Sequence, residues 1–292
     1  MHEDLKGHTH TMKIRITDTL TEEDITAVNR LTAACMREEP TAVTFPADEE
    51  DTDYILAEDD GVLLAAMALC RIDEAEYECM AWVLPEVRRK GWFTALWEEA
   101  EELLADRHGD EEAAVSFVTD VRSVSAPPVL QRLGADPGAE ELEMNVPLVP
   151  IPPVLPPEAF RLISDPKEQT ARYAVTAADL TPEFLAKLPG DLPAILREAA
   201  AQGADRVPLF AASVLEGSDG QCWLFEIEVA EPVRGLGFGT CIFPDFLSFL
   251  EDELGLIEAG LQVSADNVPA VRLYEKNGFH TAVALKYYEL MV

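Results

Sequence analysis

Basic side chains are scarce in this chain. Lys and Arg number 22 against 55 Asp and Glu, which gives a formal net charge of −33 at pH 7. A field of this sign repels polyanions, so nucleic acid and anionic membrane surfaces are excluded as main partners. It attracts cations such as a polyamine or a basic peptide, although general solubility or adaptation to salt explains the same composition equally well. An anionic ligand would need a local cluster of cationic side chains and free backbone N–H groups.

Long apolar runs and paired cysteines are lacking as well. No apolar run reaches the roughly 18 residues that a membrane span needs. The five cysteines are odd in number and none has the C-x-x-C spacing, which argues against a disulfide framework and against a zinc site. Reduced thiols are typical of a cytoplasmic protein, so we expect a cytoplasmic location, no membrane contact and no metal.

The N-terminal segment has no apolar stretch of the kind that forms the core of a secretory signal. We expect residues 1–12 to form a flexible leader, with Met12 as an alternative start. His8 and His10 are spaced so that they could bind a metal together, but a disordered tail is the simpler interpretation.

The chain repeats itself at half its length. Residues 83–93 resemble residues 229–239 at an offset of 146 positions (229 − 83). At the same offset the strand-like segments 114–118 and 260–264 coincide, and so do the apolar positions of the intervening helices. One register thus aligns a strand, a turn, a helix and a second strand, which indicates two copies of one fold.

Five prolines lie within residues 149–157, which excludes a central strand or a helix interior there. We interpret residues 150–157 as a stiff, extended connector. The predicted organisation is therefore a first domain at 13–149, a linker at 150–157 and a second domain at 158–292.

Each half has the pattern of a mixed α/β domain, because strands with period-two alternation are interspersed with amphipathic helices. A Thr21…Asp24 capping box opens the first helix, and Asp59-Asp60-Gly61 closes a hairpin. In the first half we expect strands at 13–17, 53–58, 62–72, 77–84, 113–119 and 141–147, with helices within 21–37 and at 94–106 and 126–133. In the second half we expect a helix-rich region at 166–205, strands at 207–215, 222–229, 260–264 and 283–290, and helices at 240–254 and 268–277.

A glycine-rich turn between a strand and a helix follows Val233 in the second half. Gly235, Gly237 and Gly239 allow positive φ and close approach of the backbone to a ligand. The first turn of a helix has unpaired N–H groups and a positive dipole end, so this arrangement favours a phosphate group. Arg234 adds a positive charge. The spacing is neither that of a Rossmann fingerprint nor that of a Walker loop.

A second motif follows that turn. Asn267 opens a helix that carries Pro269 in its first turn and ends at Gly278. Ala270, Leu273 and Tyr274 share one face of it. Together, the segments 234–239 and 267–279 resemble the pyrophosphate loop R/Q-x-x-G-x-G/A and the N-x-x-A-x-x-L-Y-x-x-x-G-F segment of the GNAT superfamily of acyl-CoA-dependent N-acyltransferases, in the family's order and spacing.

This resemblance implies two tandem GNAT-like domains, each with a mixed, mostly antiparallel twisted sheet flanked by helices. It implies that acetyl-CoA binds along strand 226–229, with Asn267 on its pantetheine arm and Tyr274 as the general acid that protonates the leaving thiolate. A buried core aromatic with a satisfied hydroxyl is the alternative for Tyr274. The implied coenzyme contacts in the second half are Ile227, Val229, Val233, Arg234, Gly235, Leu236, Gly237, Phe238, Gly239, Thr240 and Asn267.

Direct transfer to an amine requires a base, since an ammonium ion must lose its proton before it attacks. Glu226 and Glu228 lie on one face of the strand that precedes the turn. They are the candidate general bases, acting through water, and a merely polar strand face explains them equally well.

The first half resembles the same superfamily with departures. It keeps the arginine and one glycine of the turn, and its later segment has Val121 or Ser123 in place of Asn267 and Leu130 in place of Tyr274. Because leucine cannot donate a proton, we expect a surviving coenzyme site with reduced chemistry. The coenzyme contacts expected there are Val83, Arg88, Arg89, Lys90, Gly91, Trp92 and Phe93.

The leading hypothesis is an N-acetyltransferase that passes an acetyl group directly from acetyl-CoA to a primary amine, either a small cationic amine or a peptide or protein amine. The chain has neither a G-x-S-x-G motif nor a cysteine close to a histidine in the sequence. Nothing in it therefore indicates a covalent acyl-enzyme intermediate. The alternatives are a non-catalytic acyl-CoA-binding or regulatory module and a scaffold or dimer interface. The sequence leaves the acceptor, the acyl chain length and homodimer formation open.

Overall fold

The computed structural model describes residues 12–109, 111–164, 170–201 and 206–292. The described chain forms two compact units. Unit 1 comprises the chain up to Glu140 together with Ala284–Val292, and unit 2 comprises Glu141–Val283. Each unit has its own run of strands and its own hydrophobic core.

Unit 1 is a mixed sheet with the strand order β1-β2-β3-β4-β5-β12. All pairings in it are antiparallel except that of β4 with β5. Its strands are β1 (Lys13–Thr17), β2 (Thr52–Asp59), β3 (Val62–Asp73), β4 (Glu76–Val83), β5 (Ala114–Asp120) and β12 (His280–Met291), and its helices are α1 (Glu22–Glu38), α2 (Trp92–His108) and α3 (Ala126–Leu133).

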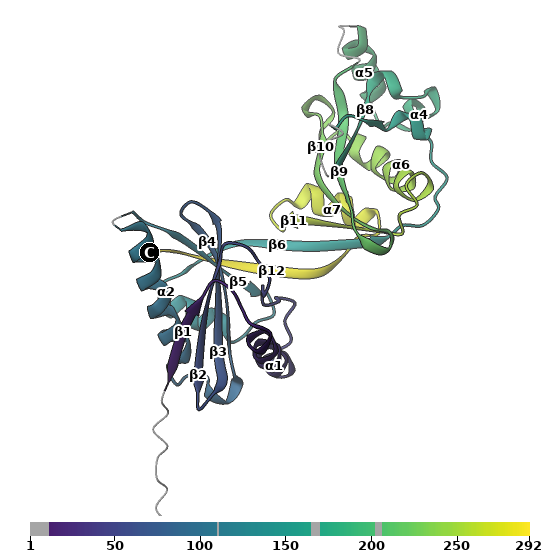
Figure 1. The fold of residues 1–292 in the computed structure, drawn as a ribbon. Helices are drawn as coiled ribbons and strands as arrows, with labels where there is room; N and C mark the ends of the chain where they lie inside the picture. The colour runs from purple at the N-terminus through teal and green to yellow at the C-terminus, as the bar shows by residue number, and fades with distance from the viewer. Residues whose placement is uncertain (1–11, 110, 165–169, 202–205) are drawn as a thin grey trace, which may run out of the picture. The chain divides into compact units, whose positions relative to one another are not determined.

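Helices cover both faces of the unit 1 sheet, and Figure 1 shows α1 and α2 on opposite sides of it. Alternate residues of β3 point to the two faces, so Ala66 and Ala68 pack with α1 while Ala65 and Met67 pack with α2. The Thr21–Asp24 capping box predicted from the sequence opens α1. The apolar run of β3 is continuous because helices cover the strand on both faces.

Unit 2 has the strand order β6-β11-β10-β9-β8-β7, with one parallel pairing, between β10 and β11. Its strands are β6 (Asp136–Pro147), β7 (Arg161–Leu162), β8 (Ala171–Thr176), β9 (Pro208–Glu216), β10 (Gln221–Val229) and β11 (Glu258–Ser264). Its helices are α4 (Pro182–Lys187), α5 (Leu192–Ala201), α6 (Phe238–Asp252) and α7 (Val268–Lys276). The helix-rich region expected at 166–205 therefore also contains the strand β8.

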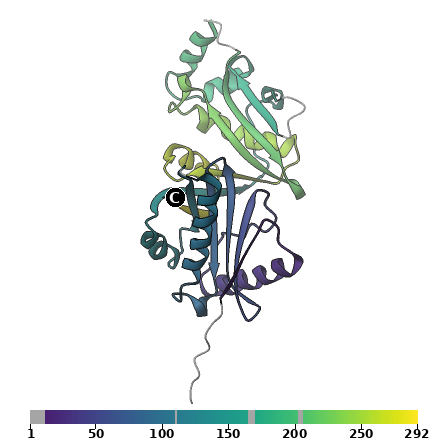
Figure 2. The ribbon, with the colours of Figure 1, turned by 60° about the vertical axis from the view of Figure 1, so that its left-hand side comes forward.

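All four of these helices place apolar side chains in one cluster, on one face of the unit 2 sheet. Figures 1 and 2 show α4 and α6 on the same side of β8, β9 and β10. Helices α4 and α5 are inserted between β8 and β9, where unit 1 has the hairpin turn Asp60-Gly61. Among the described residues no helix of unit 2 takes the place that α1 has in unit 1.

The closing strands are exchanged between the two halves of the chain. Strand β12 pairs with β5 of unit 1 through Leu285–Met291, and β6 pairs with β11 of unit 2 through Glu141–Pro147. Relative to the predicted domains 13–149 and 158–292, residues 141–149 thus belong to unit 2 and residues 284–292 to unit 1. Each of the two strands is the last strand of its sequence repeat. Their sequence patterns are therefore alike and do not predict which unit each strand joins.

The proline-rich segment is attached to α6 rather than free. The buried Asp245 carboxylate accepts the N–H groups of Val154 and Leu155 at 3.1 and 2.9 Å, and Ser248 Oγ donates to the carbonyl of Ile151 at 2.8 Å. Leu155 is buried in the unit 2 core. The segment predicted as a linker is therefore packed against α6 and is part of unit 2.

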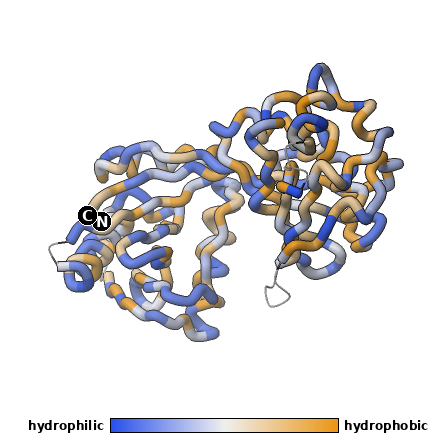
Figure 3. The backbone as a smooth tube through the Cα atoms, turned by 90° about the horizontal axis from the view of Figure 1, so that it is seen from above, coloured by the Kyte–Doolittle hydropathy of each residue, from blue (hydrophilic) through white to orange (hydrophobic). Residues whose placement is uncertain are grey.

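No described helix is both long enough and apolar enough to cross a membrane. In Figure 3 hydrophilic and hydrophobic residues alternate over short distances along the chain. No group of three or more metal-ligating side chains occurs among the described residues. The leader at 1–12, with His8 and His10, lies outside the described residues except for Met12.

Candidate functional site

The glycine-rich turn of unit 2 joins β10 to α6. Gly235 and Gly237 have φ values of 74° and 92°, a backbone region that side chains disfavour. Gly237 caps α6, and Cys241 is the first helical residue whose N–H reaches back to the Gly237 carbonyl. The amides that precede Cys241 in the turn have no intrahelical acceptor and mark the positive end of the helix dipole. This turn can hold an anion with its main chain.

Unit 1 contains the same turn in the same conformation. Gly91 caps α2 with a φ of 89°, and the N–H of Ala95 reaches the Gly91 carbonyl. Arg89 has a φ of 63° at the position equivalent to Gly235. The internal repeat inferred from the sequence is therefore a structural repeat down to the hydrogen bonds of the turn. The unit 1 turn adopts its shape with an arginine where unit 2 has glycine, which strains the backbone.

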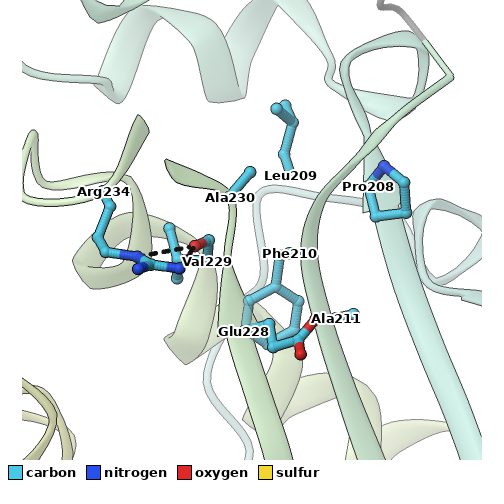
Figure 4. A pocket seen from close by; sticks show the side chains of 8 residues that line it. All are labelled: Pro208, Leu209, Phe210, Ala211, Glu228, Val229, Ala230 and Arg234. Carbon is cyan, nitrogen blue, oxygen red and sulfur yellow. Dashed lines mark hydrogen bonds between the residues drawn. The ribbon is translucent and has the colours of Figure 1, made fainter. Parts of the chain in front are cut away.

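The arginine that leads each turn anchors it to the preceding strand. Arg234 donates from Nε and Nη2 to the carbonyl of Val229 at 3.2 and 3.0 Å, as Figure 4 shows. Arg88 donates from Nε to the carbonyl of Val83 at 3.1 Å. Arg234 remains exposed beside a pocket of about 280 Å³ between the ends of β9 and β10, so its charge is available next to the turn.

Strands β10 and β11 separate before they reach the turn. Their parallel pairing ends at Leu224 and Leu261, so within the described part of the chain no strand pairs with residues 225–229 of β10 on that side. A bulge accompanies the separation, because the register with β9 shifts between Phe225 and Glu228. Glu226 lies in this bulge with a φ of 49°. The free edge of β10 can pair with an extended amide-containing ligand.

Two glycines of the turn also permit close packing. A Cβ on Gly239 would lie 3.3 Å from Val229 Cγ2, and one on Gly237 would lie 2.8 Å from Pro189 Cγ. Gly235 has nothing within 4 Å of such an atom. Of the other predicted contact residues, Val233 and Phe238 are buried, so they can offer only backbone groups, while Leu236 and Thr240 are exposed.

Asn267 and Tyr274 lie on α7. The Asn267 Oδ1 caps the helix by accepting the N–H of Ala270 at 3.4 Å. The Tyr274 ring is buried between Phe243 and Phe279 at centroid distances of 5.6 and 5.7 Å. Its hydroxyl makes no hydrogen bond within the described residues. Burial raises the pKa of Tyr274 above its ordinary value, which keeps the phenol protonated at neutral pH.

Arg172 of β8 connects the two candidate bases. Its Nη1 and Nη2 bind Glu226 Oε2 and Glu228 Oε2 at 2.8 and 3.0 Å, and Ser213 Oγ donates to Glu226 Oε2 at 2.9 Å. Both carboxylates lie on one face of β10, as the sequence predicts. Their side chains stay 63% and 67% exposed, so water reaches both despite the ion pairs. Arg172 and Ser213 were not recognised from the sequence, because they lie far along the chain from the motif.

In unit 1 a carboxylate at the end of α1, that of Glu39, binds near the turn. One oxygen of its carboxylate accepts from Ser123 Oγ and from the N–H groups of Val124 and Ser125 at 2.8, 2.6 and 3.1 Å. Its other oxygen binds Arg88 Nη1 at 3.3 Å. The carboxylate therefore bridges the turn before α2 and the start of α3. An internal anion thus already uses the Arg88 guanidinium and the amides at the start of α3.

Hydrogen bonding controls the charge of Glu39. Burial by itself would raise the pKa of this carboxyl, but hydrogen bonds from Ser125, Ser123 and Val124 outweigh that effect and lower its pKa to about 2. The residue at the place of Tyr274 is Leu130, which is buried in the unit 1 core. Unit 1 thus lacks the hydroxyl that unit 2 offers, and it contains a permanent negative charge instead.

The family model described as the acetyltransferase (GNAT) family matches residues 20–134 and 201–279, more than half of the chain. The chain belongs to the GNAT acetyltransferase family. This family comprises acetyltransferases, and its acyl donor is acetyl-CoA. An N-alpha-acetyltransferase of Sulfolobus acidocaldarius is 35% identical over 65 residues, which are 22% of this chain and 39% of that protein. The chain thus matches less than half of the length of this curated relative.

Solved structures agree with the tandem form of the GNAT fold. A GCN5-related N-acetyltransferase from Sphaerobacter thermophilus superposes with a TM-score of 0.61 at 20% identity, over 96% of this chain and 95% of that one. A tandem GNAT protein from the clavulanic acid biosynthesis pathway gives a TM-score of 0.56 at 16% identity, over 96% and 98% of the two chains. At these identities the likeness establishes the fold, and the two-domain GNAT architecture predicted from the sequence is confirmed.

Proposed function

We propose that unit 2 transfers an acetyl group from acetyl-CoA directly to a primary amine. The observation that carries the proposal is the turn at 234–240. Its amides at 235–240 have no backbone acceptor among the described residues, and with the Arg234 side chain they adjoin the edge of β10 that β11 does not pair with. The pyrophosphate is held by these main-chain donors, and the pantetheine arm extends along residues 226–229 beside Asn267. Ile227 and Val229 supply the strand backbone for that pairing.

The reaction follows from the groups around the thioester. Glu226 and Glu228 take up a proton from the acceptor ammonium through water, since both are exposed on the strand beside it. The neutral amine attacks the carbonyl carbon, the C–N bond forms and the C–S bond breaks. Tyr274 donates its proton to the departing thiolate, and its raised pKa keeps that proton available at neutral pH. Arg172 holds the two carboxylates in place.

The two units differ in how they meet the coenzyme. In unit 1 the residues Val83, Arg88, Arg89, Lys90, Gly91, Trp92 and Phe93 keep the turn, but the carboxylate of Glu39 pairs with the Arg88 side chain that leads it. We therefore propose that unit 1 binds acetyl-CoA more weakly than unit 2 and does not turn it over. A non-catalytic acyl-CoA-binding module is the competing function, and release of free thiol in the presence of amines separates the two.

The test uses a matched pair of glycine substitutions. Gly235 and Gly255 both have positive φ, at 74° and 67°, and neither has an atom within 4 Å of an added Cβ. Gly235→Glu places a carboxylate in the turn, whereas Gly255→Glu places the same charge just beyond the far end of α6. We expect Gly235→Glu to lower coenzyme affinity by about a hundred-fold through charge repulsion and blocked approach, and Gly255→Glu to leave it unchanged.

Isothermal titration with acetyl-CoA and thiol release over a panel of amines are the measurements. Gly235→Glu binding that equals wild type would exclude the turn as the coenzyme site. Tight binding of acetyl-CoA by wild type with no thiol release from any amine would establish the non-catalytic module instead.

A further inference from the structure

An exposed tryptophan lies on the face of the unit 2 sheet that the described helices leave uncovered. Trp223 is 44% exposed, and Phe225 and Leu215 on the same face are 36% and 39% exposed. The other three tryptophans of the chain are buried in unit 1: Trp82, Trp92 and Trp97. Large apolar side chains grouped on a surface in this way mark a binding site.

The tryptophan forms one end of a row across three strands. Trp223 of β10 pairs with Gly260 of β11, which pairs with Asn145 of β6. Because Gly260 has no side chain, the indole lies over it, with ring atoms 3.5 Å from the position of a Cβ. A pocket of about 110 Å³ opens beside the ring and is lined by Asn145, Glu143 and Glu258 among others.

The groups around this pocket are suited to bind a cation. The Asn145 Oδ1 atom is buried and has no hydrogen-bond partner among the described residues. Glu143 and Glu258 contribute carboxylates, and the indole offers a π face. An ammonium or guanidinium group would satisfy the amide oxygen, the carboxylates and the ring together. A second copy of this chain would bring the same carboxylates and the same net charge of −33, so the like charges oppose self-association here.

The spacing along β10 indicates the size of the partner. Trp223 precedes Glu226 by three positions, which corresponds to about 10 Å along an extended strand. A small amine cannot contact both places, whereas an extended polypeptide can. We propose that this face binds a cationic segment of a polypeptide, and that an amine of the same polypeptide is acetylated beside Glu226 and Glu228. This inference rests on the function proposed for unit 2 and names its acceptor class.

Trp223 itself reports on the docking, because it is the one tryptophan of the chain that is exposed. The full-length protein is titrated with a lysine hexapeptide, with a glutamate hexapeptide of equal length as control, and acrylamide quenching of the emission is followed. We expect the lysine hexapeptide to protect Trp223 and the glutamate hexapeptide to have no effect. The double variant Glu143→Gln and Glu258→Gln should raise the dissociation constant for the lysine peptide about five-fold.

Glu253→Gln is the matched control, since Glu253 is an exposed carboxylate at the end of α6 and away from this face. It should leave the dissociation constant unchanged. Turnover adds a second reading: Trp223→Ala should raise KM for the lysine hexapeptide several-fold and leave KM for a small amine as it is.

One outcome would overturn the proposed docking surface and leave the proposed function intact. In that outcome small amines support thiol release, but the lysine peptide does not alter the emission of Trp223. Protection of Trp223 that rises with protein concentration, without peptide, would assign the face to a second copy and also overturn the proposal. Peptide binding at Trp223 without any thiol release would instead overturn the proposed function and support the docking surface.

Discussion

At the scale of single residues, the phenol and the two carboxylates proposed for the reaction lie in different environments. Tyr274 is buried among aromatic rings and stays protonated, while Glu226 and Glu228 remain in contact with water. The environments, rather than the residue types, suit the first to give a proton and the others to take one.

Replacing Tyr274 tests the proposed proton donor. Tyr274→Phe keeps the aromatic packing and removes only the hydroxyl, so coenzyme affinity should remain at the wild-type value. We expect kcat to fall by about 10²-fold or more, because the thiolate then leaves without a positioned proton. Steady-state kinetics measure kcat, and isothermal titration measures the coenzyme affinity. An unchanged kcat would show that another group, or water, protonates the thiolate.

Glu39 should make the stability of unit 1 depend on acid pH. Its pKa is about 2 in the folded protein, below the ordinary value of 4.5, so its ionised form stabilises the fold above pH 4.5. That contribution, about 3 kcal/mol at full strength, is lost as the pH falls from 4.5 toward 2. Unfolding followed by urea denaturation at several pH values should show the loss in wild type. In Glu39→Gln the dependence over this range should be flatter, and an identical pH profile would refute the assignment.

At the scale of elements, the two units reach one turn geometry from different surroundings. In unit 1 the end of α1 supplies Glu39, which binds at the start of α3. Unit 2 has no described counterpart of α1 and instead inserts α4 and α5, whose connector places Pro189 against Gly237. In unit 1 the end of α1 therefore supplies a carboxylate that links the turn before α2 to the start of α3, and no described helix of unit 2 supplies one.

The contact between α6 and the proline-rich segment gives an element-scale prediction. Asp245→Ala removes the acceptor of two backbone N–H groups, those of Val154 and Leu155, and leaves them buried without a partner. We expect the free energy of unfolding of unit 2 to fall by about 2 kcal/mol. Asp245→Asn keeps an acceptor and should cost less. Thermal unfolding of the three proteins measures the order, and equal melting temperatures would show that the segment contributes nothing to unit 2.

At the scale of the whole molecule, the exchange of closing strands makes the two halves of the chain depend on each other. The last nine residues of the chain belong to unit 1, although the helix that precedes their strand, α7, belongs to unit 2. Cutting the chain at its proline-rich segment would therefore remove one strand from each sheet. The units are separate in their cores but not in their covalent order.

Two nearby aromatic residues test this exchange. Phe279 is buried in the core of unit 2, and Tyr288, nine positions later, is buried in the core of unit 1. Tyr288→Ala should destabilise unit 1 by about 3 kcal/mol, and Phe279→Ala should destabilise unit 2 by a similar amount. Hydrogen exchange resolved by segment distinguishes them, since α2 and β5 should lose protection in the first variant and α6 and β11 in the second. Loss of protection in the same unit for both variants would contradict the exchange.

The sequence by itself determined the repeat, the GNAT family and the location of the turn. These depend on local patterns: alternation along strands, helix caps such as Thr21, and glycines at positions where φ is positive. Most of the predicted helices and strands match the structure within a few residues, because apolar periodicity marks the face that each element buries. Strands β7 and β8 were not predicted, and β6 begins earlier than expected. The roles of Tyr274, Glu226 and Glu228 stay predictions, and the structure adds to them Arg172, which no local pattern marks.

Only the tertiary structure decided which sheet receives each closing strand, what bridges the unit 1 site and which sheet face is left bare. Strands β6 and β12 have equivalent patterns, so their pairing depends on the edges that neighbouring strands present. Glu39 reaches residues more than 80 positions away, and Trp223 stands out only once the helices lie on the other face. Contacts between distant segments depend on how whole elements pack, and that information is not contained in any local stretch of the chain.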